Sequence, residues 1–263
     1  MDYETIVMER KGPVANLVLN RPEKLNAVSP RLLEELSQAL DELSKAQEIR
    51  AVVIRGSGRA FSSGTDLQAL AGHGLERLPS AFRYHLARMQ ETYGRLASLE
   101  RPVLAQMHGY ALGAAMELAL ACDFRICTTD TIFSLPEVQY CLVPDLGGCQ
   151  RLARTVGLAK AKELVMLGRR FNGVEAERMG IVHKAVAAGD LETEVSSWVE
   201  EILKLPPSAV GLAKRVVDLS LEASLDVGLD YTGQVQAALF ASHDFMEAVR
   251  ARLEGREPRF QGD

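Results

Sequence analysis

The chain lacks the residue patterns that mark several large classes of protein. Its 4 cysteines include no CxxC pair and its 5 histidines are scattered, so no zinc-binding spacing is present. The longest apolar run, near residues 111–122, carries Glu117 and is about half as long as a membrane-spanning helix. The first residues, MDYETIVMERKG, lack the apolar segment of a secretory signal. We therefore expect a cytoplasmic protein with reduced thiols and no membrane contact.

Motifs that bind nucleotides or supply a serine nucleophile are also missing. Gly56-x-Gly58 follows an apolar run, but Phe61 stands where a dinucleotide-binding loop has its third glycine. No GxxxxGK[ST] phosphate loop and no GxSxG elbow occur. These absences argue against a dinucleotide-dependent enzyme, a phosphate-loop protein and a serine hydrolase.

The charge of the chain favours no polyanionic partner. Its formal net charge is −5 and its pI is about 5.7, with no stripe of alternating basic and aromatic residues. The basic cluster of Lys160, Lys162, Arg169 and Arg170 is interpreted as a solvated helix face rather than a binding patch. We expect no nucleic-acid partner.

Hydrophobic periodicity predicts an α/β fold. The expected strands are residues 3–9, 14–19, 51–54 and 103–107, and the expected helices between them are residues 30–45 and 78–96. Ser29 and Pro30 suit the cap and the first position of the helix over residues 30–45. Alternating strands and helices of this kind build mostly parallel sheets.

Beyond residue 145 the pattern becomes mainly helical. The expected helices are residues 147–156, 159–167, 174–179, 191–203, a helix starting at 206–207, 225–240 and 243–253, with a strand at 181–186. There is no internal repeat and no linker tract. We expect an α/β core over residues 1–205 and a C-terminal helical region over residues 206–263.

The candidate site lies within residues 106–145. A short strand leads through the small-residue loop HGYALGAA into an apolar helix that carries Glu117, and Glu137 and Asp145 follow. Small residues let a ligand approach the backbone, and N–H groups at a helix start stabilise negative charge. Carboxylates around such a point indicate proton transfer beside a stabilised oxyanion. The alternative is an ordinary strand-to-helix turn with a solvated glutamate.

A second loop offers a similar arrangement. Gly64 precedes Thr65, Asp66 and Leu67 at an expected helix start, where a backbone N–H can face a ligand oxygen. A tight turn with Thr65 or Asp66 as a helix cap explains the same pattern.

Four ordered segments resemble the crotonase family, the enoyl-CoA hydratase/isomerase superfamily. They are NRPEKLNA (20–27), RAFSSGTDL (59–67), HGYALGAAMELALACDFRI (108–126) and SLPEVQYCLVPDLGGCQRLARTVG (134–157). The resemblance implies a crotonase-like α/β spiral of ββα repeats with a C-terminal helical trimerisation region. It also implies an acyl-CoA thioester substrate, no metal or redox cofactor, and a homotrimer or a dimer of trimers.

The resemblance assigns roles to individual residues. The oxyanion hole falls on the backbone N–H groups of Thr65 and Ala114, where family members often have glycine at Ala114 and Ala115. Glu117 and Glu137 match the glutamate pair with which hydratases add water to a 2-enoyl-CoA; isomerases often retain only one of the two.

Further residues are implied to bind the CoA ester. Lys24 offers a cation to the CoA phosphates, unless it is an ordinary exposed loop lysine. The others are Leu25, Ala27, Ala60, Ser62, Ser63, Gly64, Asp66, Leu67, Gly113 and Pro136.

Asp145 departs from the hydratase pattern. Hydratases usually have glycine here, whereas dienoyl-CoA isomerases have a catalytic aspartate, with glutamate at position 137 and aspartate at position 117. Asp145 is thus either a further acid–base group or the cap of the helix that begins at Gly147. Enoyl-CoA hydratase is the leading hypothesis, and an enoyl-CoA or dienoyl-CoA isomerase using Glu137 and Asp145 is the alternative. A non-catalytic acyl-CoA-binding subunit would require that the carboxylates be lost.

Overall fold

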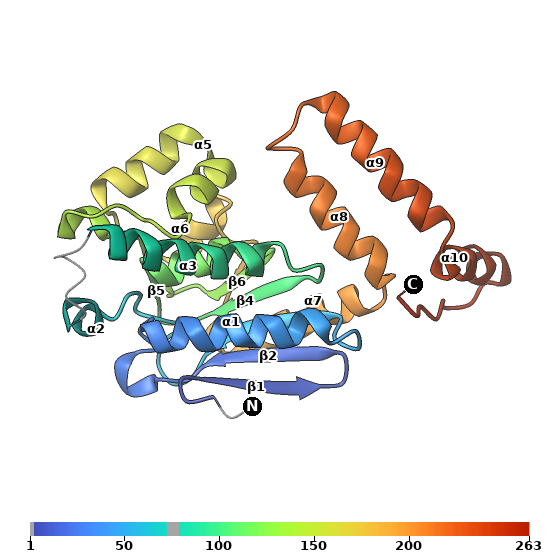
Figure 1. Ribbon diagram of the computed structural model, residues 1–263. Coiled ribbons are helices and arrows are strands. Elements are labelled where there is room, and N and C mark those ends of the chain that lie inside the picture. Colours follow the sequence, from blue (N-terminus) through green and yellow to red (C-terminus); the bar gives the residue numbers. More distant parts are fainter. Residues whose placement is uncertain (1–2, 73–78, 263) are drawn as a thin grey trace.

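The computed structural model describes residues 3–72 and 79–262 of the chain. Its main sheet has the strand order β1-β2-β3-β4-β6-β8, antiparallel between β1 and β2 and parallel at the other pairs (Figure 1). The strands are β1 (Ile6–Lys11), β2 (Val14–Leu19), β3 (Ala51–Gly56), β4 (Val103–Met107), β6 (Phe124–Thr128) and β8 (Lys184–Val186). A second, parallel sheet pairs β5 (Tyr110–Leu112) with β7 (Ile132–Ser134).

Two strands and a helix recur along the chain. β4 and β5 are followed by α4 (Ala114–Leu120), and β6 and β7 are followed by the short 3-10 helix η3 (Glu137–Tyr140) and by α5 (Gly148–Leu167). Isolated backbone bridges, Ser62 to Ala111 and Phe133 to Phe171, continue the short sheet on both sides. This arrangement brings the starts of α4 and of α2 (Leu67–Gly72) to neighbouring loops.

Local periodicity predicts many elements to the residue. β2, β4, α1 (Pro30–Lys45), α7 (Leu191–Leu203) and α9 (Leu225–Phe240) have the expected bounds. The Ser29 hydroxyl caps α1 by accepting the N–H of Leu32.

Some predicted bounds are wrong. The first strand begins at Ile6 and ends at Lys11, because its ladder to β2 continues until Lys11 faces Val14 at the turn. The strand expected over 181–186 is only Lys184–Val186. The helix expected over 78–96 is α3 (Pro79–Ala97), and residue 78 lies outside the described residues. The helices expected over 147–156 and 159–167 form α5, which is interrupted by non-helical backbone at Gly157. The short helix expected over 174–179 is α6 (Gly173–Arg178).

The core lies between the main sheet and the helices that cover it. The stripe of Leu33, Leu36, Leu40 and Leu43 on α1 is buried. α1 and α3 both give side chains to the same core cluster. Burying one such leucine contributes roughly 1.5–3 kcal/mol, so this stripe holds α1 against the core.

The C-terminal helices α8 (Pro207–Leu219), α9 and α10 (His243–Glu254) form an arm beside the core (Figure 1, orange to red). α8 is attached to the core by an ion pair between Lys214 and Asp123, with 2.9 Å between Nζ and Oδ2. α9 buries no residue, in contrast to the core helix α1. The division of the chain at residues 205 and 206, between α7 and α8, stays a prediction.

Among the described helices, none combines the length and apolar composition that crossing a bilayer requires.

Candidate active site

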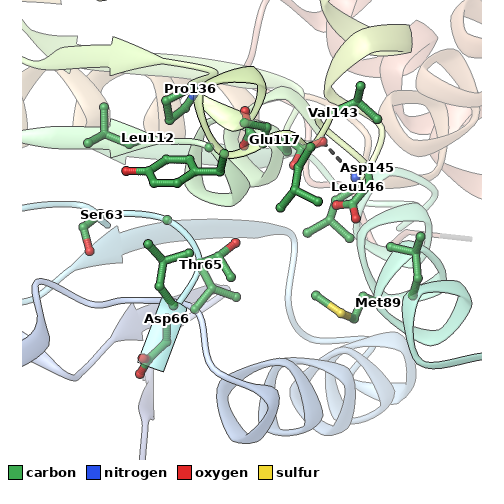
Figure 2. Close-up of a pocket in the computed structure, with 18 of the residues that line it drawn as sticks. Ser63, Thr65, Asp66, Met89, Leu112, Glu117, Pro136, Val143, Asp145 and Leu146 are labelled. Atoms are coloured by element: carbon green, nitrogen blue, oxygen red, sulfur yellow. Dashed lines mark hydrogen bonds between the residues drawn. The ribbon is translucent and has the colours of Figure 1, made fainter. Parts of the chain in front are cut away.

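A pocket of about 880 Å³ lies between the short sheet, α3 and the chain from η3 to the start of α5 (Figure 2). Its apolar wall is Val28, Pro30, Leu33, Leu67, Phe82, Leu86, Met89, Leu112, Leu142, Val143 and Leu146. Its polar side chains belong to Ser63, Thr65, Asp66, His85, Glu117, Ser134, Glu137, Gln139, Tyr140, Asp145 and Arg170. A pocket of this size and composition suits a mainly apolar small-molecule ligand held by a few polar groups.

Two backbone N–H groups lie close together beside this pocket, that of the lining residue Thr65 and that of Ala114, which follows the lining residue Gly113. The bridge beside Thr65 uses the carbonyl of Gly64 and the N–H of Asp66, so it leaves the N–H of Thr65 unused. Ala114 is the first residue of α4, where an N–H has no partner within the helix. In the parts of the chain that the structure describes, neither N–H has an intramolecular acceptor. A Cβ on Gly64 would lie 3.6 Å from the nitrogen of Ala114, so the two groups are close.

The glycines before these N–H groups cannot be replaced without strain. Gly64 has φ +87° and Gly113 has φ +50°, a region that residues with a side chain rarely adopt. A Cβ on Gly64 would lie 2.3 Å from the carbonyl oxygen of Leu112, and one on Gly113 would lie 2.6 Å from Oε1 of Glu137. The Glu137 carboxyl therefore lies against the backbone that leads into α4.

Glu117 is buried in the first turn of α4, with 1% of its surface exposed. Its Oε1 accepts the N–H of Leu146 at 2.8 Å (Figure 2) and the N–H of Gly148 at 2.7 Å. Burial raises the pKa of Glu117 to about 8, although these two N–H groups favour the ionised form. At neutral pH the carboxyl therefore holds a proton that Oε2 can carry while Oε1 accepts both N–H groups.

Two further carboxyl groups of the pocket, those of Glu137 and Asp145, are perturbed in the same direction. Burial raises the pKa of Glu137 and of Asp145, and the charge of Asp145 adds to the shift at Glu137. Oε2 of Glu137 is buried, and none of the residues that the structure describes is its hydrogen-bond partner. Burial in a poorly solvated pocket therefore favours the protonated form of both groups, which is the direction of shift that a general acid requires.

The interpretation of Asp145 as the cap of α5 is wrong. Gly147 holds the cap position with φ +98°, and glycine has no side chain with which to cap the helix. Glu117 from α4 already accepts the N–H groups of Leu146 and Gly148. The Asp145 side chain instead lines the pocket beside Leu146 and Met89 (Figure 2).

The residues predicted to bind the CoA ester fall into two groups. Ser63, Gly64, Asp66, Leu67, Gly113 and Pro136 line the pocket. Ala27, Ala60 and Ser62 are buried outside its lining. Lys24 and Leu25 precede Ala27 in the same loop and also lie outside the lining, with Nζ of Lys24 3.2 Å from Oε1 of Gln68.

Asp66 combines a structural role with its place in the pocket. Its Oδ1 accepts the N–H of Ala69, so the interpretation of Asp66 as a helix cap is confirmed. Its Oδ2 lies 3.0 Å from Nη2 of Arg21. Burial opposes ionisation, but the Ala69 N–H and the Arg21 guanidinium together lower the pKa of Asp66.

Sequence reasoning missed several residues that organise the site. Asn26 is fully buried; its Oδ1 accepts the N–H of Arg21, and its Nδ2 donates to the carbonyls of Ser57 and Ala60, each at 2.8 Å. Its side chain thus joins the two loops beside the pocket. A polar residue inside a loop has no periodicity, so only its position in the segment NRPEKLNA marks it.

Two residues of α3 were missed for another reason. Gln90 Nε2 donates to the carbonyl of Asp145 at 2.6 Å, and the Tyr93 hydroxyl donates to the carbonyl of Ala114 at 3.0 Å. Helix periodicity places both residues but cannot indicate acceptors on distant elements.

The basic residues Lys160, Lys162, Arg169 and Arg170 do not all have the same surroundings in the structure. Lys160 and Arg169 pair with Glu163 on the surface, as expected of a solvated helix face. Arg170 is exposed as well, and it also lines the pocket. Within the described residues, no group of histidine, cysteine, aspartate and glutamate side chains is arranged to hold a metal ion.

Comparison with known proteins is consistent along the whole chain. Residues 9–263 match the family model "Enoyl-CoA hydratase/isomerase". A protein of Mycobacterium bovis named "Probable enoyl-CoA hydratase echA8" is 38% identical over 260 residues, which cover 99% of each chain. The peroxisomal "Delta(3,5)-Delta(2,4)-dienoyl-CoA isomerase" of Arabidopsis thaliana is 36% identical over 270 residues, which cover 98% of this chain and 97% of that one.

A solved structure extends this similarity to the fold. The crystal structure of enoyl-CoA hydratase from Bacillus anthracis matches with a TM-score of 0.93 and 33% identity, covering 99% of this chain and 100% of that chain. The resemblance found in the sequence and the predicted α/β spiral are thereby confirmed. The chain belongs to the enoyl-CoA hydratase/isomerase family, the crotonase family.

Proposed function

We propose that the chain is an enoyl-CoA hydratase, which adds water across the double bond of a 2-enoyl-CoA thioester. One observation carries the proposal. The carboxyl groups of Glu117 and Glu137 line an apolar pocket beside the backbone N–H groups of Thr65 and Ala114, neither of which has an acceptor within the described residues. Relatives named as hydratases support the same reaction.

In this reaction the thioester oxygen accepts the N–H groups of Thr65 and Ala114. The oxygen of water forms a bond to the β-carbon, and the electrons of the double bond move toward the thioester oxygen. One glutamate accepts the proton that the water loses, and the other donates a proton to the α-carbon. Loss of one N–H donor from such a site typically costs about 100- to 1000-fold in turnover.

The shape of the pocket supports an acyl-CoA substrate. The apolar wall of Leu86, Met89 and Val143 suits the acyl chain. The CoA portion of the bound substrate would extend out of the pocket past Ser63 and the loop that carries Lys24. No metal or redox cofactor takes part in the proposed reaction.

A second candidate activity is double-bond isomerisation of an enoyl-CoA or dienoyl-CoA. It is favoured by the placement of Asp145, which lines the pocket with a raised pKa and does not cap α5. One carboxyl would remove a proton from one carbon of the acyl chain and another would return a proton to a different carbon. The relative from Arabidopsis thaliana is named for a reaction of this kind.

Purified protein incubated with 2-enoyl-CoA, 3-enoyl-CoA and dienoyl-CoA esters of several chain lengths would test both activities. Gain of one water by the 2-enoyl ester, detected by mass, would establish hydration. Conversion of the 3-enoyl or dienoyl ester at unchanged mass would establish isomerisation. No reaction with any ester would favour a non-catalytic acyl-CoA-binding subunit.

The variant Glu137→Gln tests the role of the carboxyl pair. Its amide has nearly the same shape but cannot exchange a proton, so turnover should fall by about 100-fold or more. Binding of a saturated acyl-CoA should persist. Unchanged turnover would contradict the proposed function.

We also propose that the chain forms a homotrimer or a dimer of trimers through its C-terminal helices. Leu225 and Leu253 expose 76% and 83% of their surface, and Phe240 and Met246 are also exposed on α9 and α10. Apolar surface of this extent is typical of an interface. A monomer in light scattering would contradict this assembly.

The free thiols of Cys122 and Cys127 support a cytoplasmic location, which fractionation of cells would test.

A further inference from the structure

Helix α3 contacts the candidate active site in two ways, through pocket-lining side chains and through hydrogen bonds to the backbone. Its residues Leu86 and Met89 line the pocket wall. Within the next turn, Gln90 and Tyr93 donate hydrogen bonds to the backbone carbonyls of two site residues, Asp145 and Ala114. One helix is therefore packed against the acyl pocket and hydrogen-bonded to the segments that carry the polar groups.

Tyr93 makes the deeper of these two bonds. Its side chain is fully buried, and its hydroxyl lies 3.0 Å from the carbonyl oxygen of Ala114. Burial, followed by the charge of Glu117, raises the pKa of Tyr93 well above its ordinary value. The hydroxyl thus remains protonated and donates across the whole working pH range.

The acceptor belongs to Ala114, the residue that follows the pocket-lining Gly113. Ala114 begins α4, and its N–H has no acceptor within the described residues. The backbone just before it has φ +50° at Gly113, a conformation outside the helical region. A hydrogen bond to the Ala114 carbonyl restricts rotation of the backbone at this residue, where regular helix geometry begins.

We infer that Tyr93 is a positioning residue, whose hydroxyl fixes the orientation of the Ala114 N–H toward the developing oxyanion. The inference rests on the proposed function, in which this N–H binds the thioester oxygen. Tyr93 does not touch the substrate, since it lies outside the pocket lining. Tyr93 would keep the Ala114 N–H in the orientation that this donor must already have before the reaction begins.

The variant Tyr93→Phe tests this role, because it removes only the hydroxyl. We expect the kcat of hydration to fall about tenfold while KM changes less than about twofold, the pattern of an interaction that acts mainly in the transition state. The matched control is Glu91→Gln on the exposed side of α3, which should change neither constant.

A second measurement reports on the oxyanion directly. A 3-ketoacyl-CoA can bind as its enolate, which carries negative charge on the thioester oxygen and absorbs in the near ultraviolet. Tyr93→Phe should weaken formation of the bound enolate about tenfold and leave the affinity for a saturated acyl-CoA unchanged. A general loss of structure would weaken both ligands and lower the unfolding free energy in proportion.

The outcomes separate this inference from the proposed function. Wild-type protein that converts no ester would overturn the proposed function, while the enolate measurement would still decide the role of Tyr93. An active wild type with unchanged kcat and enolate binding in Tyr93→Phe would overturn the inference alone. Equal weakening of both ligands would assign Tyr93 a merely structural role and would also overturn it.

Discussion

Oε1 of Glu117 lies 2.7 Å from the backbone nitrogen of Gly148 and accepts its hydrogen bond. A carboxyl group at the start of α4 thereby supplies the cap of α5, which has no side-chain cap at Gly147. The same side chain lines the pocket and has a pKa of about 8. The fold therefore depends on an acceptor oxygen of this group, whereas the proposed chemistry depends on its exchangeable proton.

Substitution of Glu117 should separate these two roles. In Glu117→Gln the amide oxygen still accepts both N–H groups, so below about pH 5 we expect an unfolding free energy within about 1 kcal/mol of wild type. We expect turnover to be lower by about 100-fold or more. Glu117→Ala leaves the N–H groups of Leu146 and Gly148 buried without a partner, at a cost of about 1–3 kcal/mol each. Chemical denaturation and steady-state kinetics test the pair. Equal stability of the two variants would contradict the capping role.

The pKa of Glu117 predicts how stability depends on pH. The folded-state pKa is about 8, above the ordinary value of 4.5, so the folded protein binds this proton more tightly than the unfolded chain does. The stabilisation of the folded protein by this proton is fully present below the pKa that Glu117 has in the unfolded chain. It is lost as pH rises toward about 8. The unfolding free energy of wild type relative to Glu117→Gln should therefore fall between about pH 5 and about pH 8. Denaturant titrations of both proteins at several pH values would show it, and a constant difference would contradict the raised pKa.

The fold could be predicted largely where its causes are local. α1 and α7 follow from periodicity and caps within a single segment, and their bounds are correct. The ends of β1 depend on a ladder to β2, so they were misplaced. The loss of helical geometry at Gly157 lies where the sequence indicates a break between two helices, although the chain continues directly from one to the other.

The site could be predicted in composition but not in its connections. Family resemblance indicates Glu117, Glu137 and Asp145, and the structure brings all three to one pocket. No pattern shows that Glu117 would cap α5, because 31 positions separate it from Gly148 and their contact arises only from tertiary packing. Asp145 was misjudged as a possible cap for the same reason. The roles of these residues in catalysis stay predictions.

A methyl group added to Gly113 should impair activity. In Gly113→Ala the new Cβ would lie 2.6 Å from Oε1 of Glu137, and the backbone φ of +50° is strained for alanine. We expect the Glu137 carboxyl to be displaced and kcat/KM to fall by at least about tenfold, because misplacement of a catalytic group by about 1 Å is costly.

Gly94→Ala is the matched control for this substitution. Gly94 lies within α3, and a Cβ there would meet no atom within 4 Å. Replacing a helical glycine with alanine stabilises by roughly 0.5–1 kcal/mol, so this variant should keep full activity with a slightly higher melting temperature. Similar kinetics for the two variants would show that the site tolerates movement of Glu137.

The buried Asn26 should control the stability of the loops beside the pocket. Asn26→Ala removes the acceptor of the Arg21 N–H and the donor to the carbonyls of Ser57 and Ala60. It also places alanine at φ +55°, which asparagine tolerates better. Unpaired buried polar groups cost about 1–3 kcal/mol, so we expect the unfolding free energy to fall by about 2–4 kcal/mol in total.

The same change in an exposed residue, Asn20→Ala, is the control. Denaturation of both variants measures the difference, and the KM for an acyl-CoA reports on the loop. Because Ser63 and Gly64 continue directly from the loop that Asn26 holds, we expect KM to rise in Asn26→Ala and not in Asn20→Ala. A stability loss no larger than that of Asn20→Ala would mean that other contacts hold the two loops together. In that case the hydrogen bond from the Ser62 hydroxyl to the carbonyl of Asn26 would be the next contact to remove.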